Sequence, residues 1–256
     1  MMRFKDKVAI VTGAGQGIGF EICRMLNLEG AVVILNDVDP ELCRQAAEKI
    51  NAAGHEVCIP LTGDAADLNF IQELVDTAVN RYGKLDVVIA NAGITLYGDF
   101  FSYSKDAFDQ VMRVNLAGTF FLAQAAANQM KKQNGGSILF TSSVVGHRAL
   151  KDLAVYAMTK AAVEMLATNL VIELSAYGIN VNTVAPGATL TERTAEEADY
   201  EKVWSEITPM GRPAYAADIA TAALFFVSDA ARHVTGQHLI VDGGWSAIST
   251  LPQGLK

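Results

Sequence analysis

The sequence predicts a single doubly wound α/β domain, in which a parallel sheet is covered by helices on both faces. Two observations lead to this prediction. Short apolar runs alternate with helical patterns along the whole chain, without a linker, an internal repeat or a low-complexity segment. Polar or glycine-rich motifs follow directly after several of these runs, and the carboxyl ends of parallel strands meet at one edge of a sheet. We therefore expect one ligand site at that edge.

The composition is that of a protein with a large hydrophobic core. The chain has 256 residues, of which 51% are hydrophobic, and this length allows one α/β domain or two small ones. Its net charge of −8 argues against nucleic acid as a partner, because non-specific binding needs a basic surface. Residues 1–7 are charged and do not resemble a signal peptide, and 114–130 is too polar for a membrane span. We expect neither a nucleic-acid nor a membrane partner.

The cysteines and histidines indicate a reducing compartment and no metal centre. The three cysteines are an odd number without a CxxC pair, which is typical of reduced cytosolic thiols. The four histidines form no metal-ligand spacing with them. We therefore expect a cytoplasmic protein without a bound metal.

The first strand is expected over 7–12, followed at once by a glycine-rich turn and by a helix over 20–29. Glycines at such a turn let the backbone approach a pyrophosphate, and the start of the next helix offers free N–H groups. The turn does not follow the pattern G-x-G-x-x-G. It reads T-G-x-x-x-G-x-G, with Thr12, Gly13, Gly17 and Gly19. It predicts a dinucleotide site, and a tight turn without a ligand is the alternative.

The second strand, over 31–36, ends on an acidic residue, Asp37. A carboxylate at this place accepts hydrogen bonds from the adenosine ribose and would repel a 2′-phosphate. No arginine stands beside it to bind that phosphate. NAD(H) is therefore predicted over NADP(H). Asp39 and Pro40 instead begin the next helix, over 40–53, as its N-cap and first residue.

The alternation continues with strands over 55–61 and 85–90 and a helix over 68–82 between them. Asp64 lies in the loop after the third strand. It either meets the adenine edge or shapes the turn, and the sequence favours neither. Asn91-Ala-Gly93 follows the fourth strand and predicts a tight turn at the sheet edge.

One or two apolar helices are expected over 107–130, with Asn115 near the middle. Asparagine is mildly unfavourable inside a helix. Asn115 is therefore a solvated residue, a polar contact at an interface, or a functional kink, and the sequence leaves all three open.

A strand over 137–142 leads into Ser143, and the following helix carries Tyr156 and Lys160. The spacing of four residues places Tyr156 and Lys160 on one helix face, a turn apart. An ammonium beside a tyrosine favours the phenolate, so the hydroxyl can exchange a proton with a substrate whose oxygen Ser143 holds. Taken alone, the pair is more ordinarily a solvated lysine beside a half-buried tyrosine.

The last part of the chain starts with a strand over 179–185 and a turn at Pro186-Gly187. The stretch 188–209 is polar and acidic, and we expect it to form a substrate lid. A helix over 216–228 and a strand over 237–242 complete the expected fold.

Taken together, the motifs resemble those of the short-chain dehydrogenase/reductase family along essentially the whole chain. The set comprises the turn after Thr12, Asn91-Ala-Gly93, Asn115, Ser143, Tyr156-x-x-x-Lys160, Pro186-Gly187 and the closing Asp242-Gly-Gly. The resemblance implies a Rossmann-type sheet of seven strands and a homotetramer or homodimer. It also implies hydride transfer between nicotinamide and a carbonyl or alcohol carbon. Ala90 departs from the pattern, because many members have asparagine there, and we expect only a local change in hydrogen bonding.

The resemblance also implies a role for each site residue. Tyr156 would be the acid/base, Ser143 would orient and polarise the substrate oxygen, and Lys160 would assist Tyr156 and bind the nicotinamide ribose. Asn115 would hold a water that links Lys160 to solvent, and Thr191 would hold the carboxamide. The residues expected to contact NAD are Gly13, Gln16, Gly17, Ile18, Gly19, Asp37, Asp64, Ala65, Asn91, Ala92, Gly93, Tyr156, Lys160, Pro186, Gly187, Thr189 and Thr191.

Two substrate classes compete within the family. Reductases of 3-oxoacyl groups on acyl carrier protein tend to carry basic docking residues before the fifth strand and at the end of the catalytic helix. This chain has Gln133-Asn134 and Tyr177 there, and its lid is acidic. We favour a small neutral alcohol, a sugar or polyol. A dinucleotide-binding scaffold or sensor without turnover is an alternative of another class, although such a protein is expected to have lost the serine, tyrosine or lysine.

A last hypothesis concerns Arg148, which follows Ser143 closely, beside His147. Its planar guanidinium suits a substrate carboxylate or a pair of hydroxyls. The alternative is a solvated pair of loop residues.

Overall fold

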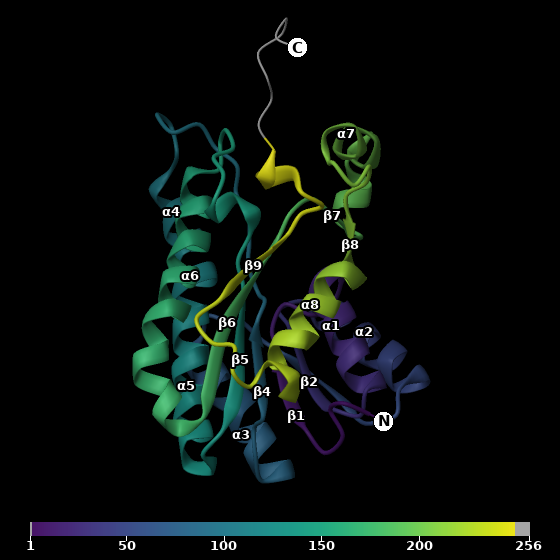
Figure 1. The fold of residues 1–256 in the computed structure, drawn as a ribbon, viewed down its shortest axis with the longest axis vertical. Coiled ribbons are helices and arrows are strands. Elements are labelled where there is room, and N and C mark those ends of the chain that lie inside the picture. The colour runs from purple at the N-terminus through teal and green to yellow at the C-terminus, as the bar shows by residue number, and fades with distance from the viewer. Residues whose placement is uncertain (1, 249–256) are drawn as a thin grey trace, which may run out of the picture.

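A parallel sheet of seven strands forms the centre of the protein, as the doubly wound prediction requires (Figure 1). The computed structural model describes residues 2–248. Neighbouring strands are parallel throughout, in the order β3-β2-β1-β4-β5-β6-β9. The strands of this sheet are β1 (Val8–Val11), β2 (Val32–Asp37), β3 (Cys58–Thr62), β4 (Val87–Ala90), β5 (Gly136–Thr141), β6 (Ile179–Pro186) and β9 (His238–Val241).

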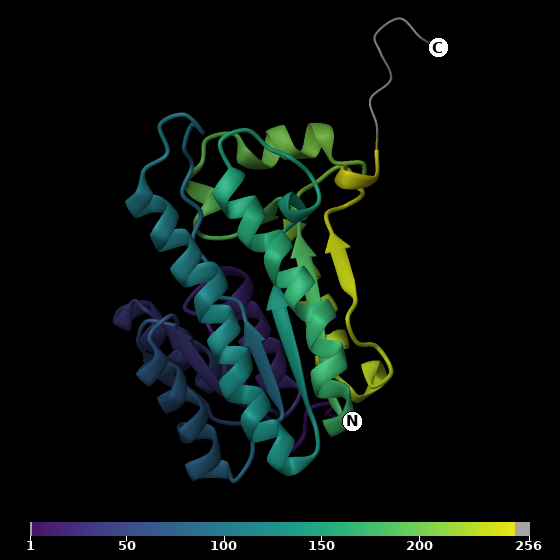
Figure 2. The ribbon, with the colours of Figure 1, turned by 90° about the vertical axis from the view of Figure 1, so that its left-hand side faces the viewer.

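Helices cover both faces of the sheet and make three layers (Figures 1 and 2). One face carries α1 (Gly17–Leu28), α2 (Pro40–Ala53) and α8 (Ala216–Val227). The other face carries α3 (Leu68–Tyr82), α5 (Thr119–Gln133) and α6 (Ala154–Leu174). Two shorter helices, α4 (Lys105–Val111) and α7 (Tyr200–Ile207), lie toward the end of the molecule where the strands finish.

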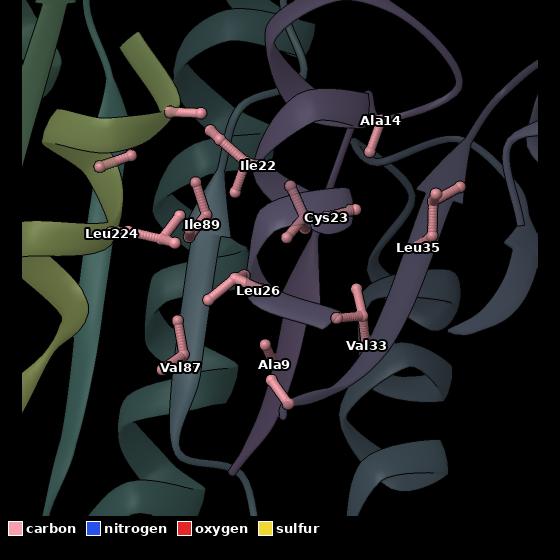
Figure 3. Close-up of a cluster of buried hydrophobic side chains, with 14 of the residues drawn as sticks. Ala9, Ala14, Ile22, Cys23, Leu26, Val33, Leu35, Val87, Ile89 and Leu224 are labelled. Carbon is pink, nitrogen blue, oxygen red and sulfur yellow. The ribbon is translucent and has the colours of Figure 1, made fainter. Parts of the chain in front are cut away.

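Each face of the sheet has its own hydrophobic core, because successive side chains of a strand point to opposite faces. In β1, Ala9 and Val11 belong to the core under α1 and α8, whereas Val8 and Ile10 belong to the core under α3 and α5. Figure 3 shows the first of these cores, where Ile22, Leu26 and Leu224 gather over the sheet. A parallel strand covered on both faces is apolar at every position, and all four residues of β1 are buried.

The strand order reverses at β1, and this reversal places the site. The chain moves from β1 outward to β2 and β3, then crosses back to β4 on the other side of β1. The loops after β1 and β4 therefore leave the sheet in opposite directions. They open a crevice at its carboxyl edge, where ligands bind in folds of this type.

The largest difference from the sequence prediction lies within 107–130. The structure divides this stretch into α4, a π-helical segment η1 (Met112–Gly118) and α5, which continues to Gln133. Backbone hydrogen bonds in a π-helix join residues five apart instead of four apart as in an α-helix. In so short a segment, the spacing of the apolar residues does not reveal this difference. The predicted third strand also began too early, because β3 starts at Cys58.

The stretch expected to be a lid contains regular structure. It includes β7 (Thr189–Leu190), the 3₁₀ helix η4 (Thr194–Glu196) and α7, and β7 pairs with β8 (Ala214–Tyr215) in a small second sheet. By length and composition alone, the helical stretch Ala154–Tyr177 is apolar enough to cross a membrane. In this fold it lies against β6 and α5 as one of the helices that cover the sheet.

Candidate active site

A cavity of about 490 Å³ opens at the carboxyl edge of the sheet, and the predicted site residues line it. The loops after β1, β2, β3, β4, β5 and β6 all contribute to its wall. Of the residues predicted to be catalytic or to contact NAD, Asn115 alone is not in the wall. The sequence prediction did not include Thr95, Gln110, Arg113, Arg193 and Tyr200, which also line the cavity.

The glycine turn packs so closely on the β4 loop that side chains are excluded. Gly13 has a φ of +60°, and a Cβ there would lie 2.7 Å from the Ala92 Cα atom. A Cβ on Gly19 would lie 2.6 Å from the side-chain amide nitrogen of Asn91. The same amide donates to the carbonyls of Thr12 (3.1 Å) and Gly13 (2.8 Å). Asn91 thus joins the ends of β1 and β4 and fixes the backbone that would face a phosphate.

Helix α1 starts directly under this turn, and Gln16 gives it no side-chain cap. The N–H groups of its first turn are therefore available to an acceptor from elsewhere. One of them, on Gly17, donates to the Glu192 carboxylate at 2.9 Å. Glu192 follows β7, so the lid contacts the place where helix N–H groups and dipole favour an anion.

Asp37 ends β2 and faces the cavity, as predicted. Its Oδ2 accepts a hydrogen bond from Gly15 N–H at 2.8 Å, and its Oδ1 accepts one from Asp39 N–H at 3.1 Å. Each carboxylate oxygen keeps a further lone pair for a ligand hydroxyl. Asp39 caps α2, as predicted, through bonds from the N–H groups of Glu41 and Leu42.

Asp64 binds the backbone of its own turn, as the turn-shaping alternative requires, and a contact with adenine stays a prediction. Its Oδ1 accepts from Ala66 N–H at 2.9 Å, and its Oδ2 lies 2.5 Å from the Arg113 guanidinium. Partial burial alone would raise the pKa of Asp64, but the Ala66 N–H group and Arg113 outweigh it and hold that pKa below its ordinary value. The carboxylate still lines the cavity.

Asn115 is buried in the π-helical segment, which excludes the solvated alternative and agrees with a kink. Its Oδ1 accepts from Ile94 N–H at 2.8 Å, and its Nδ2 donates to the Ile94 carbonyl at 2.9 Å. Nδ2 also lies 3.3 Å from the hydroxyl of Thr159 on α6. A Cβ on Gly93 would lie 3.4 Å from both Asn115 Oδ1 and Lys160 Nζ. Asn115 and Lys160 therefore border the same small space behind the cavity.

Ser143, Tyr156 and Lys160 meet on one side of the cavity. Ser143 begins the 3₁₀ helix η2 (Val144–Gly146), with its Oγ atom 3.4 Å from Val145 N–H. Lys160 is buried, and its Nζ atom donates to the Thr141 carbonyl at 2.7 Å. The same nitrogen lies 5.4 Å from the centre of the Tyr156 ring. The predicted spacing therefore does bring the ammonium and the ring together.

The lid contributes Tyr200 to the wall of the cavity, and its helix α7 also contacts the segment after β9. Thr189 N–H donates to the Tyr200 hydroxyl at 3.2 Å, and burial raises the pKa of that hydroxyl. The Trp204 ring of α7 lies 5.6 Å from the Trp245 ring. Trp245 and Tyr156 both pack against a small apolar cluster made by Val144, Val145 and Leu153.

Arg148 does not line the cavity, so the substrate-binding hypothesis for it is not supported. Its guanidinium donates to the Ser246 carbonyl and lies 3.4 Å from the Ile248 carbonyl. It therefore holds the segment after β9. Its neighbour His147 turns toward α6 instead, where its Nε2 atom lies 2.9 Å from Glu164.

Comparisons with known proteins agree with this arrangement. A family model described as enoyl-(acyl carrier protein) reductase matches residues 13–246. An uncharacterized oxidoreductase of Thermotoga maritima is 37% identical over 254 residues, which cover 96% of this chain and 100% of the relative. The L-rhamnose 1-dehydrogenase (NAD(P)(+)) of a Sphingomonas species is 37% identical over 249 residues, which cover 95% of this chain and 98% of that enzyme.

The fold comparison leads to the same family. The crystal structure of a short-chain type dehydrogenase/reductase from Mycobacterium marinum superposes with a TM-score of 0.90 at 29% identity, and the match covers 95% of this chain and 97% of that one. The similarity therefore extends over nearly the whole chain in sequence and in fold. The protein belongs to the short-chain dehydrogenase/reductase family of oxidoreductases.

Proposed function

We propose that the protein is an NAD-preferring dehydrogenase that interconverts a small secondary alcohol, of the sugar or polyol class, and its ketone. The observation that supports this most is the convergence of Ser143, Tyr156 and Lys160 on a cavity that Asp37 and the glycine turn also line. Such a reaction needs a group that transfers a proton and a dinucleotide-binding site, both in one cavity.

The residues of the cavity fit a dinucleotide. The backbone at Gly13 and Gly19 leaves no room for side chains, and the first turn of α1 offers N–H groups to a pyrophosphate. When bound, the nicotinamide accepts or supplies the hydride. Residues 36–39 contain no lysine or arginine, and Asp37 supplies the negative charge that supports NAD over NADP.

In this proposal Tyr156 accepts the proton of the substrate hydroxyl, or returns it in the reverse direction. Ser143 donates a hydrogen bond that holds the substrate oxygen near the tyrosine. The Lys160 ammonium favours the phenolate by its charge, and the Thr141 carbonyl fixes its position. Asn115, which borders the same space as Lys160, holds a water through which the proton passes to solvent.

Charge favours a neutral substrate over an acidic carrier protein. The lid has more acidic than basic residues: Glu192, Glu196, Glu197, Asp199, Glu201 and Glu206 against Arg193 and Lys202. This charge would repel an acidic acyl carrier. The rhamnose dehydrogenase among the relatives supports a sugar or a similar polyol.

We further propose a cytoplasmic homotetramer or homodimer. Helices α5 and α6 leave Phe120, Phe121, Met165 and Ile172 exposed on the monomer, with Ile172 at 86% of its accessible surface. Apolar side chains of this size, grouped on helices, support an interface between copies of the chain. The three cysteines are free and buried, which supports a reducing compartment. Light scattering of the purified protein tests the oligomer directly.

Initial-rate assays test the proposed activity. The purified protein is given NAD⁺ or NADP⁺ with L-rhamnose, glycerol and a secondary alcohol such as 2-butanol, and NADH or NADPH with acetoacetyl-CoA. We expect turnover with NAD⁺ and at least one sugar or polyol. Turnover of acetoacetyl-CoA alone would favour the 3-oxoacyl reductase. Tight NAD binding without turnover of any compound would favour a scaffold or sensor.

A further inference from the structure

Helix α6 carries a buried carboxylate that the proposed mechanism does not use. Glu164 lies one turn after Lys160, and only 9% of its side chain is exposed. Among residues 2–248, no charged side-chain nitrogen of a lysine or arginine lies within 4.0 Å of the Glu164 carboxylate. A buried carboxylate is costly unless other groups satisfy it, so its partners are informative.

Both partners of Glu164 belong to the turn that contains Ser143. The Ser142 hydroxyl lies 2.5 Å from Glu164 Oε1, and His147 Nε2 lies 2.9 Å from the same oxygen. The Ser142 hydroxyl is also 3.0 Å from the Lys160 carbonyl. Ser142 and His147 stand on either side of Ser143 and η2 in the sequence. One carboxylate oxygen therefore binds the turn at its beginning and at its end.

The backbone of the turn lies directly on α6 between these two contacts. A Cβ on Gly146 would lie 3.2 Å from Ala161 N and 3.4 Å from Glu164 Oε1. The same helix carries Tyr156 one turn before Lys160. The position of Ser143 relative to Tyr156 is therefore set by how this turn is attached to α6.

We propose that Glu164 is a positioning residue for Ser143: its carboxylate, through Ser142 and His147, holds the turn in the register that places the Ser143 hydroxyl beside Tyr156. The inference rests on the proposed function for its catalytic consequence. A displacement of about 1 Å in a group that orients substrate can lower a rate on the order of 100-fold, so a contact outside the cavity can matter this much.

Glu164→Ala tests the proposal, and Glu164→Gln is its conservative partner. The glutamine side chain keeps the volume and one acceptor oxygen, so we expect Glu164→Gln to retain most of the activity. We expect Glu164→Ala to lower kcat by about 10- to 100-fold while the Kd for NAD⁺ stays within about twofold. Glu173→Ala is the matched control, because Glu173 is an exposed carboxylate on the same helix. It should change neither value.

A double-mutant cycle with Ser143→Ala separates positioning from a general loss of structure. If Glu164 acts through Ser143, then Glu164→Ala should lower kcat by less than about twofold further in the Ser143→Ala background. Equal losses in both backgrounds would overturn the proposal. If Glu164→Ala does not fold, His147→Ala takes its place in the cycle, because His147 is less buried. We expect His147→Ala to lower kcat by a smaller factor, and again to have little further effect in the Ser143→Ala background.

A second measurement needs no turnover. Amide hydrogen exchange of the peptide over 142–147 should become faster in Glu164→Ala, and it should stay as in the unmodified protein in Glu164→Gln and Glu173→Ala. Unchanged exchange in Glu164→Ala would overturn the proposal even if no substrate is turned over. If the unmodified protein turned over no substrate, the proposed function would be contradicted. The hydrogen-exchange measurement would then decide the role of Glu164 by itself.

Discussion

The carboxylate of Asp37 accepts a hydrogen bond from Gly15 N–H at 2.8 Å, which links the end of β2 to the glycine turn after β1. A Cβ on Gly15 would lie 2.8 Å from the same oxygen, so the contact is close enough to exclude a side chain there. Asp37 therefore has two roles. It shapes the phosphate-facing turn, and it presents charge to the place where the adenosine ribose is expected.

Substitutions of Asp37 should separate these two roles. Asp37→Asn keeps an acceptor for Gly15 N–H but removes the charge, whereas Asp37→Ala removes both. We expect the ratio of kcat/KM for NAD⁺ to that for NADP⁺ to fall in both variants, because 2′-phosphate repulsion is lost in both. Only Asp37→Ala should also weaken binding of both cofactors. A higher kcat/KM with NADP⁺ in the unmodified protein would contradict the assignment of this strand end.

Tyr156→Phe should remove turnover and keep the fold. General acid–base catalysis supplies typically ~10²–10⁴-fold in rate, and we expect a loss of this size because the Ser143 hydroxyl does not replace the phenol. Circular dichroism and the Kd for NAD⁺ serve as controls and should not change. Near-normal kcat in this variant would rule out Tyr156 as the proton-transfer group.

Glu192→Gln should strengthen NAD⁺ binding. The Glu192 carboxylate contacts Gly17 N–H at the start of α1, where it competes with a pyrophosphate and repels it. Removing one charge near a helix N-terminus changes binding by about 0.3–1 kcal/mol, or roughly two- to fivefold. Calorimetric titration at low salt measures the effect. Glu196→Gln, an exposed lid residue, is the control, and an equal gain in both variants would indicate only a change in net charge.

The buried thiols should make the protein less stable at alkaline pH. Burial raises the pKa of Cys58 to about 12, from an ordinary value of 9.0. Above pH 9 the unfolded chain loses this proton while the folded chain keeps it, so stability falls between these two pKa values. The urea midpoint should therefore drop less from about pH 8 to about pH 10.5 in Cys58→Ala than in the unmodified protein. An equal drop of the urea midpoint in the two proteins would show that other titrating groups cause the loss of stability.

Local patterns in the sequence were sufficient to predict the sheet and most of the residues that line the cavity. The glycine turn, Asp37 and Tyr156 with Lys160 each depend on a strand end or on helical spacing, and both are visible in a few residues. Because all strands are parallel, their ends share one edge, and the predicted residues line one cavity. Thr141 follows the same logic, because it ends β5 at this edge and its carbonyl accepts a hydrogen bond from Lys160 Nζ.

Contacts between distant segments could not be predicted in this way. Glu164 meets Ser142 across 22 residues only because the β5 turn packs on α6, and nothing in the local pattern of either segment indicates it. Arg148 was expected near the substrate because of its distance from Ser143. Its partner proved to be the chain after β9, 98 residues further on. In the π-helical turn, Asn115 accepts a hydrogen bond from the Ile94 N–H group, 21 residues earlier, and this contact was equally hidden.

Trp245 and Tyr156 pack against the same apolar cluster, and this has a consequence for the synthesis of the protein on the ribosome. Every strand of the central sheet precedes Trp245 in the chain, and so do the glycine turn, Asp37 and Asn91. The chain is synthesised from its N-terminus, whereas a domain generally folds as a unit. The apolar cluster against which Tyr156 packs gains its tryptophan only after the last strand of the sheet has been synthesised. Tyr156 therefore reaches its final surroundings only after every residue of the proposed dinucleotide site has been synthesised.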